Sequence, residues 1–300
     1  MKRNNYYDCK LSQCKKESTF YILERNLKNK LEIKKLTNDI LLILDLKNKE
    51  GKYTHAGILL SDKNSYRGID IVRFCKNINI LLEREGFEGQ SILAEYDKAI
   101  EMYRKYYQHE EIKGSKRKKV ETIPEKAFRE AVANALVHRT WDVNAQIKIS
   151  MFDDRIEITS PGGLPDGISK EEYLTGQISM LRNPIIAGVF FRLGIIEQFG
   201  TGVQRILNEY SNSIVKPQFA IFENSITVKL PVVQNKVTSL SPDEQRIYNA
   251  LRDKELSTSE IVNLVGFGRT KVLNIVRELI ENGYVIKIGN GRSTKYRIHK

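Results

Sequence analysis

The segment Thr122–Val143, TIPEKAFREAVANALVHRTWDV, constrains the fold of this chain more than any other stretch. Its apolar residues recur at i, i+3, i+4, i+7 and i+8, the pattern of a helix that buries one face. They are Phe128, Ala131, Val132, Ala135 and Leu136. Thr122, Pro124 and Glu125 precede this stripe and predict a capping box with a proline in the first turn. We therefore expect an amphipathic helix at the centre of the core.

The same helix carries a second row of side chains, which is polar. Glu130, Asn134 and His138 follow one another at intervals of four residues, so they lie together beside the apolar stripe. Such a row is most often the solvated face of an amphipathic helix. An acid, an amide and an imidazole beside a buried face can also form a binding site, and two glycine-bearing turns downstream favour that interpretation.

The first turn, Pro161-Gly162-Gly163, follows a strand-like run at 155–160, and the second, Gly200-Thr201-Gly202, leads into a helical pattern. Glycines let backbone amides approach an anion closely, and the start of a helix favours negative charge. A lone Gly-Thr-Gly also makes an ordinary tight turn. The polar row and both turns in this order indicate one site more strongly than any of them alone.

Four stretches resemble a prokaryotic family of transcriptional regulators and ATP-dependent DNA helicase RecG-like proteins. They are REAVANALVHRTW (129–141), FDDRIEITSPGGLPDGIS (152–169), RNPIIAGVFFRLGIIEQFGTGVQRI (182–206) and, more loosely, THAGILLSD (54–62). The resemblance runs from about residue 36 to residue 233. It implies a divergent ATPase domain of the GHKL type, the fold class of histidine kinases and gyrase.

The resemblance also implies roles for single residues. Glu130 stands where that superfamily places the catalytic base that orients the attacking water, and Asn134 where it places a Mg²⁺ ligand. Ser160 stands at about the place of the adenine-reading aspartate, and a serine lacks the charge-assisted strength of a carboxylate. ATP with Mg²⁺ is thus the implied cofactor, with hydrolysis weak at most. The implied cofactor-binding residues are Asn134, His138, Ser160, Gly162, Gly163, Gly200, Thr201 and Gly202.

Composition limits the class of protein and of partner. The 300 residues allow two domains with a sizeable core, and the net charge of +12 makes a nucleic-acid partner worth testing. Cys9, Cys14 and Cys75 form no Cys-x-x-Cys pair, so we expect neither a zinc site nor a disulfide framework, and a reduced cytoplasmic chain fits best. No signal peptide and no membrane-length apolar run is evident, so no membrane partner is expected.

Periodicity and capping signals predict most elements of the region before residue 240. The expected helices are 37–45, 91–107 and one that begins at Pro184; the expected strands are 52–61, 69–75, 78–83, 145–152, 155–160 and 226–232. Residues 169–182 are expected to be a mobile connection, which in GHKL proteins is the lid over the nucleotide. The basic run at 113–119 could contact phosphate, but a solvated loop is the commoner explanation.

After a polar linker at 233–240, the C-terminal sixty residues resemble a winged helix-turn-helix of prokaryotic regulators. Capping boxes at Ser241 and Ser257 start two helices, a third is expected at 269–282, and two strands follow. The expected DNA-binding residues are Arg269, Thr270, Lys271, Asn274 and Arg277 on the third helix, with Arg292 and Lys295 on the wing. Winged helices also serve as protein-interaction modules, but the eight Lys or Arg against two Glu from residue 268 onward favour DNA.

We therefore expect an α+β chain, a GHKL-like α/β sandwich followed by a winged helix-turn-helix. The expected divisions are a loosely packed basic N-terminal arm or helix at 1–35, an N-terminal α/β portion at 36–120, the nucleotide-binding-type domain at 121–233 and the DNA-binding domain at 241–300.

The expected function is that of a cytoplasmic transcriptional regulator that binds double-stranded DNA as a homodimer and is gated by ATP. The dimer follows only from the usual two-fold symmetry of operators. Two alternatives stay open: an ATP-hydrolysing enzyme of the helicase-associated type, and a pseudo-ATPase scaffold that binds no nucleotide. The sequence has no Gly-x-x-x-x-Gly-Lys-Ser/Thr loop, which disfavours a P-loop motor.

Overall fold

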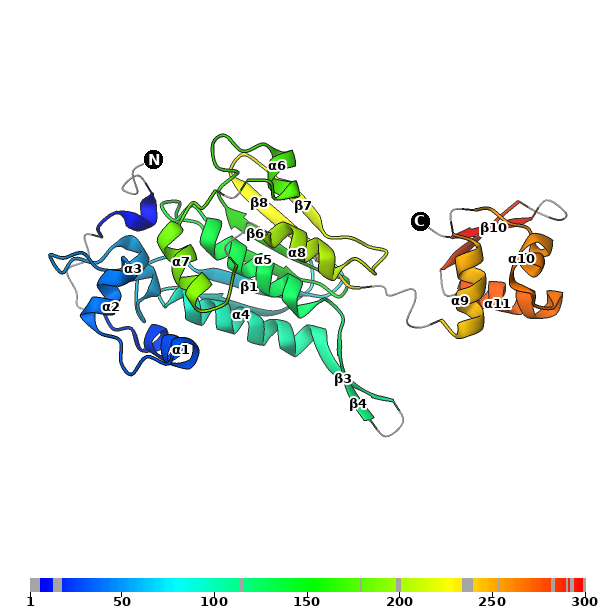
Figure 1. The fold of residues 1–300 in the computed structure, drawn as a ribbon, viewed down its shortest axis with the longest axis horizontal. Helices are drawn as coiled ribbons and strands as arrows, with labels where there is room; N and C mark the ends of the chain where they lie inside the picture. The colour runs from blue at the N-terminus through cyan, green and yellow to red at the C-terminus, as the bar shows by residue number, and fades with distance from the viewer. Residues whose placement is uncertain are drawn as a thin grey trace. The chain divides into compact units, whose positions relative to one another are not determined.

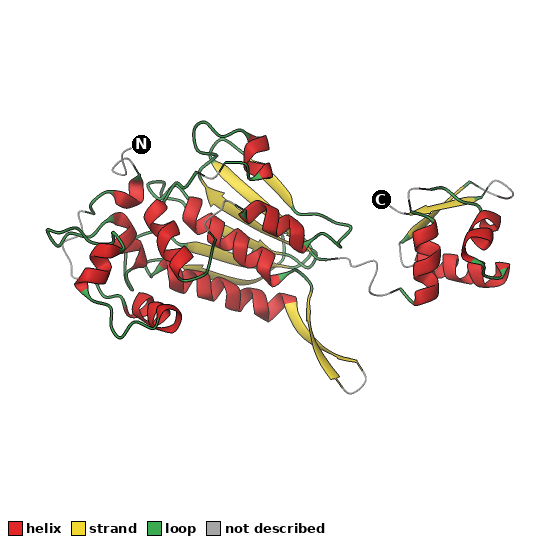
Figure 2. Ribbon diagram, in the orientation of Figure 1, coloured by secondary structure: helices red, strands yellow, loops and turns green. Residues whose placement is uncertain are grey.

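The computed structural model of this chain describes residues 6–12, 18–113, 116–178, 180–197, 201–233, 240–252, 254–281, 284–289, 291 and 294–298. The chain divides into two compact units, residues 1–211 with 215–233 and residues 212–214 with 234–300. Both contain helices and strands, as Figures 1 and 2 show, so the expected α+β class is confirmed.

A six-stranded sheet forms the centre of the first unit, in the order β2-β1-β5-β6-β8-β7. Its strands are β1 (Ile69–Phe74), β2 (Leu81–Phe87), β5 (Ile147–Met151), β6 (Arg155–Pro161), β7 (Gln218–Ile221) and β8 (Ser225–Pro231). β1 pairs with β5 in parallel, and the other neighbours are antiparallel. Strands from both sides of residue 120 thus share one sheet and one hydrophobic core.

Helices α4 (Ile92–Tyr107), α5 (Glu125–His138) and α8 (Gly202–Glu209) lie over one face of this sheet, as Figure 1 shows. The burial of β5 alternates as its sequence predicts, with Ile147, Ile149 and Met151 buried and Lys148 exposed. The apolar stripe of α5 is buried at all five of its predicted positions. The central helix therefore packs on the sheet through the face that its periodicity indicates.

The predicted capping box of α5 is wrong. The Thr122 hydroxyl donates to the carbonyl of Tyr107, and the side chain of Glu125 is bound by Arg104 and Gln108. The backbone N–H of Glu125 donates instead to the carboxylate of Glu121, at 2.8 Å. Glu121, four residues upstream, thus satisfies one of the unpaired N–H groups at the start of the helix. Thr122 and Glu125 do not form the capping box because their side chains make these tertiary contacts instead.

Residues 54–60 also differ from the expectation of a strand, because they form the helix α3 (His55–Leu60). The hydroxyl of Thr54 accepts from Gly57 N at 3.1 Å and caps this helix. Its apolar residues are all buried, and a continuous apolar run does not distinguish a buried strand from a buried helix by period. In the neighbouring helix α2 (Asn38–Ile43), the hydroxyl of Thr37 accepts from Ile40 N and caps the helix.

The N-terminal segment packs more tightly than the loose arm that we expected. Helix α1 (Tyr21–Leu31) buries Leu23 and Leu27 in the main core. Ahead of it, the short 3₁₀ helix η2 (Tyr7–Cys9) carries a buried Asp8. Its carboxylate accepts from the backbone N–H groups of Ile185 and Ile186, at 2.7 and 3.1 Å, at the start of α7 (Pro184–Arg192).

Two further segments have more regular structure than the sequence suggested. The basic run expected to be a loop lies in a two-stranded ribbon of β3 (Gln108–Lys113) and β4 (Lys116–Glu121). The expected lid contains the helix α6 (Lys170–Thr175), whose capping box joins Ser169 and Glu172. Among the described residues, none of the helices combines the length and the apolar character that crossing a bilayer demands.

The second unit has the predicted order of three helices and a strand pair. Its elements are α9 (Pro242–Ala250), α10 (Thr258–Val265), α11 (Arg269–Glu281), β9 (Val285–Ile288) and β10 (Lys295–Ile298). The capping boxes predicted at Ser241 and Ser257 are both present. On α11, Leu273 is exposed and Ile275 is buried in the core of this unit.

Candidate functional site

The polar row of α5 lies together in the structure. Glu130, Asn134 and His138 are each partly buried, and the Asn134 Nδ2 donates to Glu130 Oε1 at 3.4 Å. Because the amide nitrogen is directed to Glu130, the amide oxygen Oδ1 is left for a ligand. The row is therefore a set of three partly covered polar groups on the rim of the core, and not a solvated helix face.

Gly202, the first residue of α8, lies directly against this row. A Cβ at Gly202 would stand 2.5 Å from Nδ2 of Asn134 and 2.6 Å from Oε1 of Glu130. The start of α8 can approach α5 this closely only because residue 202 has no side chain. The sequence predicts that these three residues belong together, and the fold places them in contact distance.

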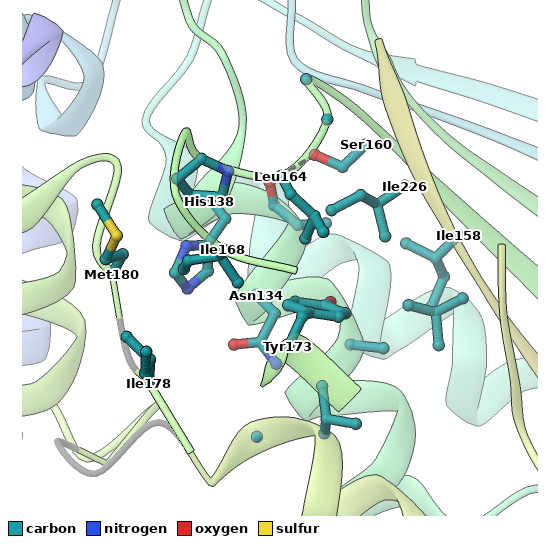
Figure 3. Close-up of a pocket in the computed structure, with 18 residues that line it drawn as sticks. Asn134, His138, Ile158, Ser160, Leu164, Ile168, Tyr173, Ile178, Met180 and Ile226 are labelled. Carbon is teal, nitrogen blue, oxygen red and sulfur yellow. Dashed lines mark hydrogen bonds between the residues drawn. The ribbon is translucent and has the colours of Figure 1, made fainter. Parts of the chain in front are cut away.

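A cavity opens between α5, the strands β6 and β8, and the segment that contains α6 (Figure 3). Its apolar wall includes Ala131, Ala135, Ile158, Ile226 and Val228. Asn134, His138, Ser160 and Tyr173 are its polar side chains, and Gly162, Gly163 and Gly202 line it as well. Among the described residues that line it there is no acid, lysine or arginine, so the cavity suits an uncharged, flat and largely apolar group.

Ser160 is almost completely buried on β6, and its hydroxyl donates to the backbone carbonyl of Ala135 at 3.0 Å. This bond uses the only hydroxyl proton and leaves the oxygen of Ser160 as an acceptor. An amine N–H of a ring in the cavity could be accepted by that oxygen.

A second cavity adjoins the first on the far side of the polar row. Asn134, His138 and Gly202 line both cavities, and Glu130, Glu197 and Thr201 line only the second. Arg205 on α8 forms an ion pair with Glu197 and lies 4.0 Å from Glu130. A ligand that filled both cavities would extend from the uncharged first cavity, past Asn134, into the second cavity, which is lined by the carboxylates of Glu130 and Glu197.

Burial raises the pKa of Glu130, while Arg205 and the hydrogen bond from Asn134 oppose that rise. A carboxylate that has lost part of its hydration is a better proton acceptor than an exposed one. The desolvating surroundings of His138, together with the nearby Arg182, lower the pKa of its imidazole to about 4. His138 is therefore neutral at pH 7 and contributes one hydrogen-bond donor and one acceptor.

Close packing around the first turn requires glycine at both Gly162 and Gly163. Gly162 has φ +104°, and a Cβ there would collide with Thr140 and with the guanidinium of Arg182. At Gly163 a Cβ would collide with the carbonyl of Glu223. Both glycines line the first cavity, but close packing alone accounts for them.

Arg182 and Tyr173 are site residues that the sequence did not single out. Arg182 donates from Nη1 to the carbonyl of His138 and from Nη2 to that of Gly163, at 3.1 and 3.0 Å, and so ties the turn to the end of α5. Tyr173 lines the first cavity from α6, and burial raises its pKa to about 12, so its hydroxyl stays protonated. No spacing rule connects either residue to α5, because both come from the segment expected to be irregular.

Two candidate residues, Gly200 and Arg292, lie outside the described residues. Thr201 is the residue before α8 and makes no side-chain capping bond. In the second unit, Arg269, Thr270, Lys271, Asn274 and Arg277 are all exposed on α11, and Lys295 is exposed on β10. Lys271 has partners of its own, since its Nζ lies 2.6 Å from Asp243 and over the ring of Phe267.

Two segments of the chain match known family models. Residues 144–230 match the one described as "Putative ATP-dependent DNA helicase recG C-terminal". Residues 253–299 match "Transcriptional regulator DIP2311-like, C-terminal domain". These matches confirm the resemblance to RecG-like regulators that the sequence motifs indicated.

The RecG C-terminal segment contains β5, β6 and β8 with Ser160, Gly162, Gly163 and Gly202, but begins after α5, which carries Glu130, Asn134 and His138. The DIP2311-like segment contains α10, α11 and the β9–β10 pair.

The fold as a whole has a solved counterpart. It is similar to that of the DIP2311 protein from Corynebacterium diphtheriae, with a TM-score of 0.68 and 20% sequence identity over 98% of this chain. The chain spans 64% of the length of that protein. Comparison with curated proteins gives no match. The structural likeness supports the fold, and the two family matches support a regulator-type chain with an ATPase-like segment.

Proposed function

We propose that this chain is a DNA-binding transcriptional regulator whose first unit binds a nucleotide. The observation that carries the proposal is the meeting of Asn134, Gly202 and the Gly162–Gly163 turn around one uncharged cavity beside a second, acidic one. The match of residues 144–230 to a RecG-type segment supports an ATPase-like unit. The unit would then be a divergent GHKL-like sandwich, acting in the cytoplasm.

The residues present fit a purine ring in the first cavity. Ala131, Ala135 and Val228 offer an apolar surface for the ring, and the oxygen of Ser160 is available to accept from an exocyclic amine. A neutral acceptor makes a weaker bond than the aspartate of typical GHKL sites. We expect the affinity for ATP to be correspondingly modest.

The second cavity fits phosphates only together with a cation. Glu130 and Glu197 would repel a triphosphate, and Arg205 already neutralises part of their charge. Mg²⁺ prefers oxygen ligands and is usually shared between a few protein oxygens and the phosphates of the ligand. Among the described residues no cluster of three or more His, Cys, Asp or Glu could hold a metal alone. Oδ1 of Asn134 would be the protein ligand, and the cation would neutralise the phosphates when both are bound.

The second unit is proposed to be a winged helix-turn-helix that holds DNA through α11. Its support is the match of residues 253–299 to a regulator family and the exposure of Arg269, Asn274 and Arg277 on one helix. A recognition helix needs this arrangement, in which polar and basic side chains lie opposite the buried stripe. Two such units in a homodimer would contact the two halves of an operator, and closure of the 169–182 segment over a nucleotide would gate that binding.

DNA binding is tested with the full chain, a fluorescent duplex and anisotropy. Arg269→Ala with Arg277→Ala is expected to weaken binding by roughly tenfold or more, since each lost phosphate or base contact costs about 1–3 kcal/mol. Lys254→Ala is the matched control, because Lys254 is an exposed cation of the same unit outside α11. Equal affinities of the control and the double variant would refute this role of α11. Adding ATP with Mg²⁺ to the wild type tests gating.

An ATP-hydrolysing enzyme is the second candidate, and the raised pKa of the desolvated Glu130 is the observation that favours it. Glu130→Gln keeps the shape of the side chain and removes its basicity. Slow ATP turnover that disappears in this variant, while ATP binding persists, would establish the enzyme. Turnover that is absent from the wild type would leave the nucleotide as a regulatory ligand.

A further inference from the structure

The ribbon of β3 and β4 is the feature of the first unit that the proposed function leaves without a role. It forms a sheet of two strands, separate from the six-stranded sheet. Figures 1 and 2 show it extending away from the sheet and helices of that unit. A two-stranded ribbon by itself is marginally stable in water, so a projecting ribbon gains from a partner that covers it.

Its charge points to the kind of partner. The sequence from Lys113 to Lys119 contains five Lys or Arg and no acid. The described side chains of Arg117 and Lys119 are 76% and 55% exposed, and Ile112, which faces Arg117 in the ladder, is 74% exposed. The whole ribbon also carries Glu110, Glu111 and Glu121, so its excess of two cations is concentrated in the acid-free end at 113–119. This basic, solvated end with an exposed apolar residue beside it fits a polyanion better than an acidic peptide groove or a core contact.

The present partners of these cations are easily replaced. Arg117 lies 3.4 Å from Glu110, and Lys119 lies 3.5 Å from Glu125. The Arg117–Glu110 pair is exposed on both sides, and such pairs are worth about 0–1 kcal/mol. Glu125 is largely buried, but it keeps its partner Arg104 when Lys119 leaves it. A DNA phosphate can therefore take over either cation at little cost, and the binding of that cation releases counterions condensed on the DNA.

The size of the ribbon selects duplex DNA among the polyanions. Each strand has six residues, so the ribbon is about 20 Å long at the usual rise per residue. The major groove of B-form DNA is about 12 Å wide and admits a two-stranded ribbon, whereas the A-form groove of duplex RNA is too narrow. We propose that the β3–β4 ribbon is a second contact with double-stranded DNA, made by the first unit and independent of α11.

The base of the ribbon connects this contact to the candidate nucleotide site. α4 ends at Tyr107, where β3 begins, and β4 leads through Thr122 into α5. The N–H of Thr122 donates to the carbonyl of Tyr107 at 3.0 Å, and the hydroxyl of Tyr103 donates to Ile123. A contact with DNA at the ribbon would therefore be made by a segment that leads directly into the start of the helix that carries Asn134.

The test is the salt dependence of affinity for a labelled duplex of arbitrary sequence, measured with the full chain. Arg117→Ser with Lys119→Ser should lower the slope of log K against log salt by about 2, and weaken binding at low salt by roughly tenfold or more, since each phosphate contact contributes about 0.9 to that slope. Lys34→Ser with Lys49→Ser is the control. These exposed lysines flank α2, which lies at the opposite end of the unit from the ribbon in Figure 1.

The outcomes separate this inference from the proposed function, on whose DNA partner it rests. A ribbon variant with the slope and affinity of the wild type, while the α11 variant loses both, overturns the ribbon contact and leaves the regulator standing. A wild type that binds no duplex even at low salt overturns both. A ribbon variant that changes the oligomeric state in sedimentation, with DNA affinity unchanged, makes the ribbon an interface between copies and also overturns the proposal.

Discussion

A Cβ at Gly202 would lie 2.5 Å from the side-chain nitrogen of Asn134, so the start of α8 and the middle of α5 meet where one residue has no side chain. The same Cβ would lie 2.6 Å from a carboxylate oxygen of Glu130. This contact joins the polar row of one helix to the turn that precedes another. The two cavities beside the polar row share both Gly202 and Asn134.

Gly202→Ala is expected to displace Asn134 and Glu130 without unfolding the chain. The atoms that a methyl group would meet are the ends of flexible side chains, which can turn aside. Nucleotide affinity should fall by roughly tenfold or more, because a misplaced group loses a hydrogen bond to a charged partner worth about 1.5–3 kcal/mol. Calorimetric titration with ATP and Mg²⁺ measures the change.

Gly86→Ala is the control for this substitution, because a Cβ at Gly86 on β2 meets nothing within 4 Å. It should bind nucleotide like the wild type. If Gly202→Ala and Gly86→Ala have the same affinity for ATP, the contact between Gly202 and the polar row has no part in binding.

Asp8→Ala is expected to destabilise the first unit by about 1–3 kcal/mol, the cost of losing a helix cap and leaving buried donors unpaired. The buried carboxylate of Asp8 accepts from Ile185 and Ile186 at the start of α7, across 177 and 178 residues of sequence. Urea unfolding followed by circular dichroism measures the effect. Asp39→Ala is the control, because Asp39 is an exposed acid in the first turn of α2 and its loss should change stability little.

Glu95→Gln is expected to remove a pH dependence from stability. Burial raises the pKa of Glu95 on α4 to about 8, although the charge of Arg139 opposes the rise. The folded chain then holds a proton on Glu95 that the unfolded chain releases near its ordinary pKa of about 4.5. Because the folded state binds more protons between these values, its stability falls as pH rises from about 4.5 to 8.

The loss over that range should be on the order of a few kcal/mol. Unfolding midpoints at pH 5.5 and 8.5 should therefore differ for the wild type and converge for Glu95→Gln. Glu101→Gln, an exposed position on the same helix, should keep the dependence of the wild type. If the stability of Glu95→Gln still falls between pH 5.5 and 8.5, another titrating group causes the pH dependence.

The parts of the fold that follow from local periodicity could be predicted from the sequence. The stripe of α5, the alternation of β5 and the capping boxes at Ser241 and Ser257 depend on residues a few positions apart. The spacing of Glu130, Asn134 and His138 likewise indicates that they lie side by side.

What could not be predicted depends on distant residues. Glu121 replaces the expected cap of α5, because Thr122 and Glu125 are bound to α4 and to β3. Arg182 and Thr140 fill the space that Gly162 leaves, and nothing in the local sequence of the turn indicates them. The helix at 55–60 was missed because its mostly apolar run has no period that distinguishes a buried helix from a buried strand.

The central claim is that the polar row of α5 and the glycine turns bind one nucleotide, and ATP titration of Asn134→Ala beside the wild type tests it most directly. With Mg²⁺, the wild type should bind one ATP per chain, and the variant should bind at least tenfold more weakly, while without the metal the two should differ little, since Oδ1 of Asn134 acts through the cation. Failure of the wild type to bind ATP at millimolar concentration, or equal affinities of the two proteins with Mg²⁺, would contradict the account.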